Sequence, residues 1–198
     1  MTAFVVNPVY ANWSHEHNQT EPMCIVTYDG NKIVVYSDTV PDYKGTTVRK
    51  IKWTLIKERI TDAVFRGDKL VSVNLQDDRI KPIWIELRGV DAENAIPLLF
   101  KTTVDLTRDL ANIDAHRSTV NDAIVETLGH DRMLNRHKSP STWTKSNAKR
   151  IIQDAIEDTL TIYDLWEFGA TKGFIRLRSR VTGEVEEVQV NWNQEGEI

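Results

Sequence analysis

The chain has 198 residues, with 25 Lys and Arg against 29 Asp and Glu, which gives a formal net charge of −4. Its hydrophobic content of 40% and charged content of 27% exclude a disordered or fibrous chain and indicate one ordinary domain. No apolar run approaches the ~18 residues that a membrane-spanning helix needs, and the N-terminus lacks the pattern of a secretory signal. We therefore expect a soluble, intracellular protein.

The first 22 residues are predicted to form an irregular N-terminal arm, because prolines and asparagines interrupt a few scattered apolar side chains. Trp13 is the largest apolar side chain of this arm and a candidate contact with a partner. The remaining residues, 23–198, are predicted to form a single α+β domain.

A β-hairpin is predicted over residues 23–37, where two β-rich runs flank Asp29-Gly30. A two-residue turn at this position would pair Val26 with Ile33. Because both faces of the hairpin are apolar, we expect it to be covered on both sides. The only cysteine, Cys24, lies in an apolar run and is expected to be a buried thiol, not a nucleophile or a metal ligand.

Three further strands are predicted over residues 48–60, 69–75 and 82–88, from alternating apolar side chains and turn residues between them. From about Asp91 to Ile113, apolar residues recur every three or four positions, which predicts a helix. A second helix is expected from Ser118 to Leu128, with its end at Gly129.

The clearest helical pattern runs from Ser146 to about Gly169, and a hairpin with a turn at Thr182-Gly183 follows it. That turn would pair Leu177 with Val188. Strands, then helices, then strands predict an α+β fold. Its sheet should be mostly antiparallel and built from the N-terminal strands and the C-terminal hairpin, with about three helices between residues 91 and 169.

Charge is sorted into two neighbouring blocks. Residues 132–150, the basic block, hold six Lys or Arg and no acid, whereas residues 151–170, the acidic block, hold five acids and no base. Both blocks oppose the dipole of the predicted helix, which a partner surface would explain and folding does not. The candidate interface residues are Trp13, Arg132, Arg136, His137, Lys138, Trp143, Lys145, Lys149, Arg150, Asp158, Asp164 and Glu167.

A catalytic alternative rests on residues 77–88. Asp78 precedes a predicted strand on which Glu86 and Arg88 lie two apart on one face. The pattern resembles the Asp followed by Glu-x-Lys of restriction-type metal-dependent nucleases, in which the carboxylates hold Mg²⁺ and the base assists attack on the phosphate. Arg88 stands at the Lys position, and a guanidinium cannot give up its proton at neutral pH.

These patterns together predict a non-enzymatic structural or assembly subunit that works through protein contacts, without a metal or a cofactor. A positive and a negative block on one chain can meet across a head-to-tail interface, which closes into a ring when the rotation permits. Tail or neck rings of phage particles have this anatomy, so we expect the protein in the cytoplasm or in a virus particle assembled there. Besides the nuclease, the remaining alternative is a nucleic-acid-binding protein that uses residues 132–150, where Trp143 can stack on bases.

Overall fold

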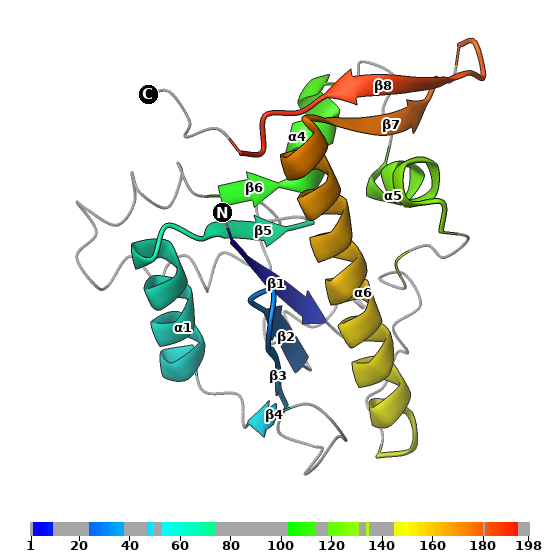
Figure 1. Ribbon diagram of the computed structural model, residues 1–198. Coiled ribbons are helices and arrows are strands. Elements are labelled where there is room, and N and C mark those ends of the chain that lie inside the picture. The colour runs from blue at the N-terminus through cyan, green and yellow to red at the C-terminus, as the bar shows by residue number, and fades with distance from the viewer. Residues whose placement is uncertain are drawn as a thin grey trace, which may run out of the picture.

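The computed structural model describes residues 2–9, 24–37, 47–49, 53–73, 103–113, 119–130, 134, 145–179 and 181–193. Within these ranges the chain forms a six-stranded sheet, a separate two-stranded sheet and four helices (Figure 1). Helix α1 (Trp53–Phe65) covers one face of the large sheet, and the long helix α6 (Lys145–Lys172) crosses the other face. The predicted α+β class is confirmed.

The large sheet has the strand order β4-β3-β2-β1-β5-β6 and is mixed. Strand β2 (Cys24–Tyr28) is antiparallel to both of its neighbours, and the other three adjacent pairs are parallel. The C-terminal hairpin forms a sheet of its own instead of extending the large one. The prediction of a mostly antiparallel sheet did not include these parallel pairs. Two of them involve the outermost strands β4 (Thr47–Arg49) and β6 (Thr103–Asp105), which are only three residues long and give little sequence signal.

The segment Ala3–Val9 is strand β1, so the prediction of an irregular arm was wrong for these residues. Strand β1 lies between β2 and β5 (Lys69–Ser72), and its side chains from Ala3 to Pro8 are buried. A central strand disfavours proline, which lacks the N–H donor. Pro8 is tolerated because β1 pairs with β5 only over Ala3–Val5, so Pro8 has a single neighbouring strand among the described residues.

The predicted strand over residues 48–60 was also wrong, since the chain forms β4 there and then begins α1. Spacing of three and four residues places Ile56, Ile60 and Ala63 on one side of α1, where they pack in one cluster with Phe4 of β1. Of the predicted helix over residues 91–113, Leu106–Ile113 form α4, Thr103–Asp105 form β6 instead, and residues 91–102 lie outside the described residues. The predicted strand 69–75 is confirmed by β5, whereas 82–88 lies outside the described residues.

The first hairpin is confirmed, with β3 at Ile33–Tyr36, but its register differs from the prediction by two residues. Tyr28 pairs with Ile33, so the loop holds four residues instead of two. The Asp29 carboxylate accepts the backbone N–H groups of Asn31 (3.1 Å) and Lys32 (2.7 Å), which favours this longer loop. Both faces of the hairpin are covered, as expected, by α1 and α6.

Helix α6 packs its apolar stripe on β1, β2 and β3. Ile152, Ala155 and Ile156 contact the strand residues Cys24, Val26 and Val35. The buried side-chain amide of Asn7 donates to the Ala155 carbonyl (3.1 Å) and to Thr159 Oγ1 (3.2 Å). Burial raises the pKa of the Cys24 thiol to about 12, which confirms the expected buried thiol.

Helix α5 and the C-terminal hairpin follow the predicted pattern, and strand β7 of the hairpin contacts both α5 and α6. Helix α5 (Val120–Leu128) begins with a capping box and ends at Gly129, whose φ is +68°, as predicted. In the C-terminal hairpin, β7 (Phe174–Arg178) pairs with β8 (Val185–Gln189), and the register again differs by two residues. Ser179 N–H donates to the Glu184 carbonyl (2.8 Å) and closes a four-residue loop.

We predict that Gly169→Ala destabilises the protein, although alanine is the better helix former by ~1 kcal/mol. A Cβ at position 169 would collide with the buried Trp192 ring and approach Val190 Cγ2 to 3.1 Å. The free energy of unfolding should fall by ~1–3 kcal/mol, measured by chemical denaturation. Thr171→Ala, at an exposed position of the same helix, should change it by less than ~0.5 kcal/mol.

Candidate functional site

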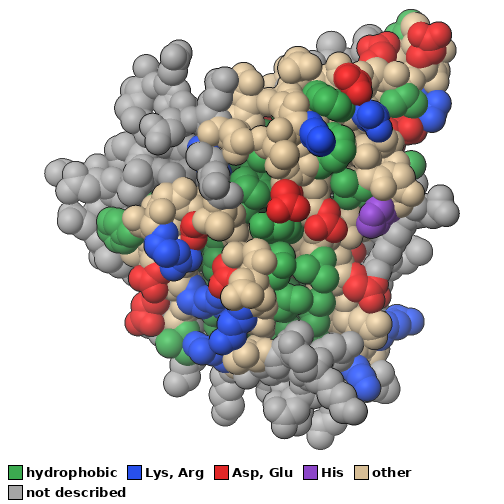
Figure 2. All heavy atoms as spheres, viewed as in Figure 1, with side chains coloured by type: hydrophobic (Ala, Val, Ile, Leu, Met, Phe, Trp, Pro, Cys, Tyr) green, Lys and Arg blue, Asp and Glu red, His purple; other side chains and the backbone are tan. Residues whose placement is uncertain are grey.

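The outer side of α6 carries exposed basic side chains near its N-terminus and exposed acidic side chains in its C-terminal half, before Lys172 ends the helix. Lys149 and Arg150 are exposed in the second turn, and Asp164 and Glu167 are exposed in the C-terminal half. At a rise of 1.5 Å per residue, positions 149 and 167 lie about 27 Å apart. Figure 2 shows acidic side chains over the middle of α6 and Lys or Arg side chains over its lower, N-terminal end.

Only some of the predicted interface residues lie within the described residues. Lys145 begins α6, although its side chain is outside the description, and six others lie outside the described residues altogether. Those six are Trp13, Arg132, Arg136, His137, Lys138 and Trp143. Asp158 was wrongly assigned to the surface, because only 4% of it is exposed. It lies three residues after Ala155 and four before Ile162, which puts it on the buried side of α6.

A tyrosine pair joins α6 to the turn between β2 and β3. The ring centroids of Tyr28 and Tyr163 are 4.9 Å apart in an edge-to-face arrangement, and Tyr163 also lies 5.7 Å from Trp166. Gly30 approaches the same tyrosine so closely that a Cβ there would come within 2.9 Å of Tyr163 Oη. The turn and the helix therefore form one surface.

Carboxylates surround this tyrosine pair, and we call Tyr28, Asp29, Tyr163, Asp164 and Glu167 the acidic–aromatic cluster. Burial and the three carboxylates of the cluster raise the pKa of both tyrosines. The negative potential of Asp29, Asp164 and Glu167 therefore converges on the two hydroxyl groups.

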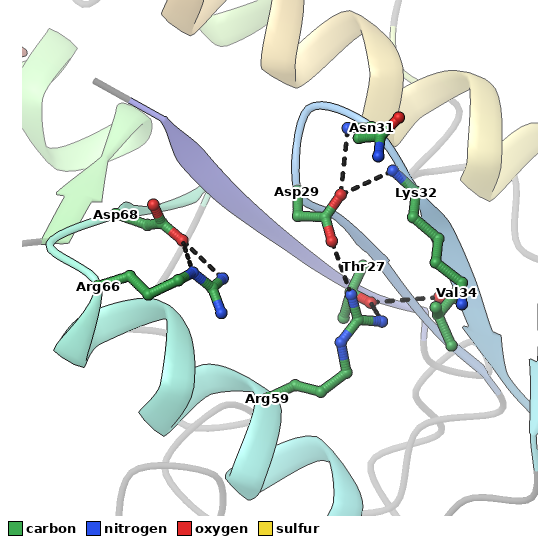
Figure 3. Close-up of polar contacts among 8 residues, drawn as sticks. All are labelled: Thr27, Asp29, Asn31, Lys32, Val34, Arg59, Arg66 and Asp68. Atoms are coloured by element: carbon green, nitrogen blue, oxygen red, sulfur yellow. Dashed lines mark hydrogen bonds and ion pairs between the residues drawn. The ribbon is translucent and has the colours of Figure 1, made fainter.

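Among the described residues, one of these carboxylates has an ion-pair partner and the other two have none. Asp29 accepts Arg59 Nη2 at 3.1 Å, and the same guanidinium donates to Thr27 Oγ1 at 3.2 Å (Figure 3). Asp164 and Glu167 form no ion pair with any residue that the structure describes. Burial raises the pKa of Asp164, and the nearby charge of His130 lowers it in part. A cationic partner group would therefore stabilise this surface.

Arg66, the other arginine drawn in Figure 3, has a structural role. Arg66 donates to Asp68 Oδ2 through two nitrogens, at 3.1 and 2.7 Å (Figure 3). The hydroxyl of Thr2 donates to the other oxygen of the same carboxylate. Since Thr2 directly precedes β1, this network fixes the start of the central strand against the turn before β5.

A different set of polar groups lies at the carboxyl ends of the parallel strands, where open α/β sheets bind ligands. Asp105 ends β6 and accepts the Arg108 N–H (3.2 Å), so it caps α4. Ser72, its neighbour on β5, has a fully buried hydroxyl without a hydrogen-bond partner among the described residues. Within the described ranges, no group of three or more His, Cys, Asp and Glu could hold a metal ion.

Comparison with known proteins gives no family. Neither a family model nor a curated protein matches the sequence. In the part of the chain that the structure describes, no helix is long and apolar enough to cross a membrane. The function is therefore inferred from the charged surface of α6 and from the strand ends.

We predict that Asp164→Asn raises the thermal stability at pH 7. Because burial raises the pKa of Asp164 in the folded chain, the folded chain holds more protons than the unfolded one between the usual and the raised pKa. The free energy of unfolding therefore falls as the pH rises from the usual to the raised pKa of Asp164. Asn at this position does not ionise, so the variant keeps the stability that the wild type loses. Calorimetric Tm values should converge for variant and wild type below the usual pKa of 3.8. Glu186→Gln, an equal change of charge on exposed β8, should show no such pH-dependent gain.

Proposed function

We propose that this chain is a non-enzymatic assembly subunit that acts through protein contacts and associates with further copies of itself. The observation that supports this most directly is the exposure of basic side chains near the N-terminus of α6 and of acidic side chains in its C-terminal half. Lys149 and Arg150 lie near the positive end of the helix dipole, and Asp164 and Glu167 lie in the half toward its negative end.

This arrangement opposes folding slightly and favours association. These charges lie between the first and last turns of α6, so the helix dipole acts on them only weakly, and a partner of opposite charge would stabilise them more. The acidic–aromatic cluster adds Tyr28 and Tyr163, a residue type that is enriched at the centres of protein interfaces. A lysine or arginine from a partner would meet both the carboxylates and the aromatic rings there.

The two ends are complementary to each other, so the simplest partner is another copy. The basic end of one copy would contact the acidic–aromatic cluster of the next, which is a head-to-tail contact. Contacts of this kind continue into a filament or close into a ring. A ring component of a large particle, such as a phage tail or neck, is the setting that we infer for this chain.

A charge-swap experiment tests the head-to-tail contact. One variant carries Lys149→Glu and Arg150→Glu, and the other carries Asp164→Lys and Glu167→Lys. Each variant alone should be monomeric in light scattering behind size exclusion at low salt, because its two ends then carry the same sign. An equimolar mixture should associate, because each variant supplies the end that the other has lost.

Lys172→Glu provides the control, since it reverses an exposed charge at the last residue of α6, which belongs to neither proposed contact, and should leave association intact. If the wild type forms oligomers and both double variants still form them, the proposal is contradicted. Polynucleotide binding that is lost with Lys149 and Arg150, in a chain that stays monomeric, would favour a nucleic-acid-binding protein instead.

A metal-dependent nuclease is the second candidate, and the sheet topology favours it. Strands β5 and β6 are adjacent and parallel, so the segments after them start from the same edge of the sheet. Asp105 ends β6, and Asp78 follows β5 by a few residues in the sequence. Carboxylates that follow neighbouring parallel strands are suited to hold Mg²⁺. Glu86 and Arg88 would complete this alternative site.

Cleavage of labelled DNA and RNA with and without Mg²⁺ tests this candidate. If it is correct, Asp78→Asn and Asp105→Asn should each reduce Mg²⁺-dependent cleavage by at least ~100-fold. Asn at position 105 can still cap α4, and a thermal denaturation curve like that of the wild type would verify that the variant folds. Asp62→Asn, at an exposed position of α1 before the start of β5, is the matched control and should retain activity. The absence of any cleavage by the wild type would rule the candidate out.

A further inference from the structure

The C-terminal hairpin has one closed edge and one open edge. On the closed side, Arg176 N–H donates to Thr127 Oγ1 (2.9 Å), and the same hydroxyl donates to the Arg176 carbonyl (3.2 Å). The Arg178 guanidinium donates to both carboxylate oxygens of Glu126, at 2.7 and 3.1 Å. Helix α5 thus occupies the outer edge of β7, so no further strand can pair there.

The backbone groups along the outer edge of β8 have no partner among the described residues. The bonds from Ser179 N–H to the Glu184 carbonyl (2.8 Å) and from Val190 N–H to the Gly173 carbonyl (2.9 Å) fix which residues bond inward. In an antiparallel pair the alternate residues point outward, which here are Val185, Glu187 and Gln189. No residue that the structure describes bonds to their backbone N–H or C=O groups, and all three residues are exposed.

The charge of this edge selects its partner. Glu184 and Glu186 have no ion-pair partner among the described residues, and Glu187 pairs with Arg176 at 3.3 Å. Pairing of β8 with β8 of a second copy would set Glu187 opposite Glu187, which is unfavourable. An extended segment with cationic side chains at alternate positions fits the edge instead. The basic block has such a stretch, with Arg136 and Lys138 two residues apart and no acid between Arg132 and Arg150.

We propose that the outer edge of β8 binds the stretch around Arg136 and Lys138, in the part of the basic block before α6, from a neighbouring copy as a third, added strand. The added strand would come from another copy, because the chain's own basic block starts on the opposite side of the hairpin. Leu134 N–H bonds to Asn121 Oδ1 of α5 (3.0 Å), and α5 lies on the β7 side (Figure 1). The free edge of β8 faces the other way. The hairpin directly follows the C-terminal end of α6, so one neighbouring copy could contact both the acidic–aromatic cluster and the β8 edge.

This inference rests on the proposed self-association, and a proline scan of the edge separates the two. Glu187→Pro removes an outward N–H and keeps the inward bonds of β8, because proline is tolerated where the N–H faces solvent. Glu187→Thr removes the same carboxylate and keeps the N–H. We expect Glu187→Pro to weaken association at least ~10-fold relative to Glu187→Thr in light scattering. Amide exchange at Ile175, Leu177 and Val188 verifies that the hairpin itself is intact.

Hydrogen exchange on the wild-type chain gives a second readout that needs no variant. The amides of Val185, Glu187 and Gln189 should exchange at least ~10-fold more slowly in the assembled state than in the monomeric charge-swap variants. If oligomers form while these amides stay unprotected, or Glu187→Pro assembles as well as Glu187→Thr, the edge is not used and self-association still stands. A wild type that stays monomeric at every concentration would overturn both.

Discussion

The packing of α6 across the large sheet is the constraint on which the surface of this protein depends. Its apolar stripe covers the face of β1, β2 and β3, and each fully buried Ile or Val contributes ~1.5–3 kcal/mol to folding. The Asn7 amide adds two buried hydrogen bonds that fix how α6 lies over β1. Once this inner face is fixed, helix geometry leaves Lys149, Arg150, Asp164 and Glu167 on the outside.

The same constraint explains what the sequence could predict. Helix α6, helix α5 and both hairpins were predictable because their signals are local: an apolar period of three to four residues, a glycine stop, and turn residues between β-rich runs. Both hairpin registers were wrong by two residues because Asp-Gly and Thr-Gly suggested the shortest turn, whereas four-residue loops formed. A shift of two preserves which face each side chain occupies, so the burial predictions survived.

Strand β1 and the parallel pairs were not predictable because their causes are not local. The segment FVVNPV resembles an arm until β2 and β5 are placed beside it, and its burial comes from partners distant in the sequence. The acidic–aromatic cluster was missed for a similar reason, since Tyr28 and Tyr163 belong to segments far apart in the chain. Gly30 was the one available signal, because it meets Tyr163 Oη, yet a turn explains any glycine there. The charge blocks were visible, although a block count could not separate buried Asp158 from exposed Asp164.

The two proposed contacts would respond differently to salt, because their physical origins differ. The contact between Lys149 or Arg150 and the carboxylates of Asp164 and Glu167 is an interaction of exposed charges, which salt screens within ~10 Å at 0.1 M. An added strand on β8 would be held by backbone hydrogen bonds, which salt weakens little. The charged contact would therefore govern how fast two copies meet, and the strand edge would govern how long they stay together. A chain with both contacts would associate more slowly at high salt but would dissociate at a nearly constant rate.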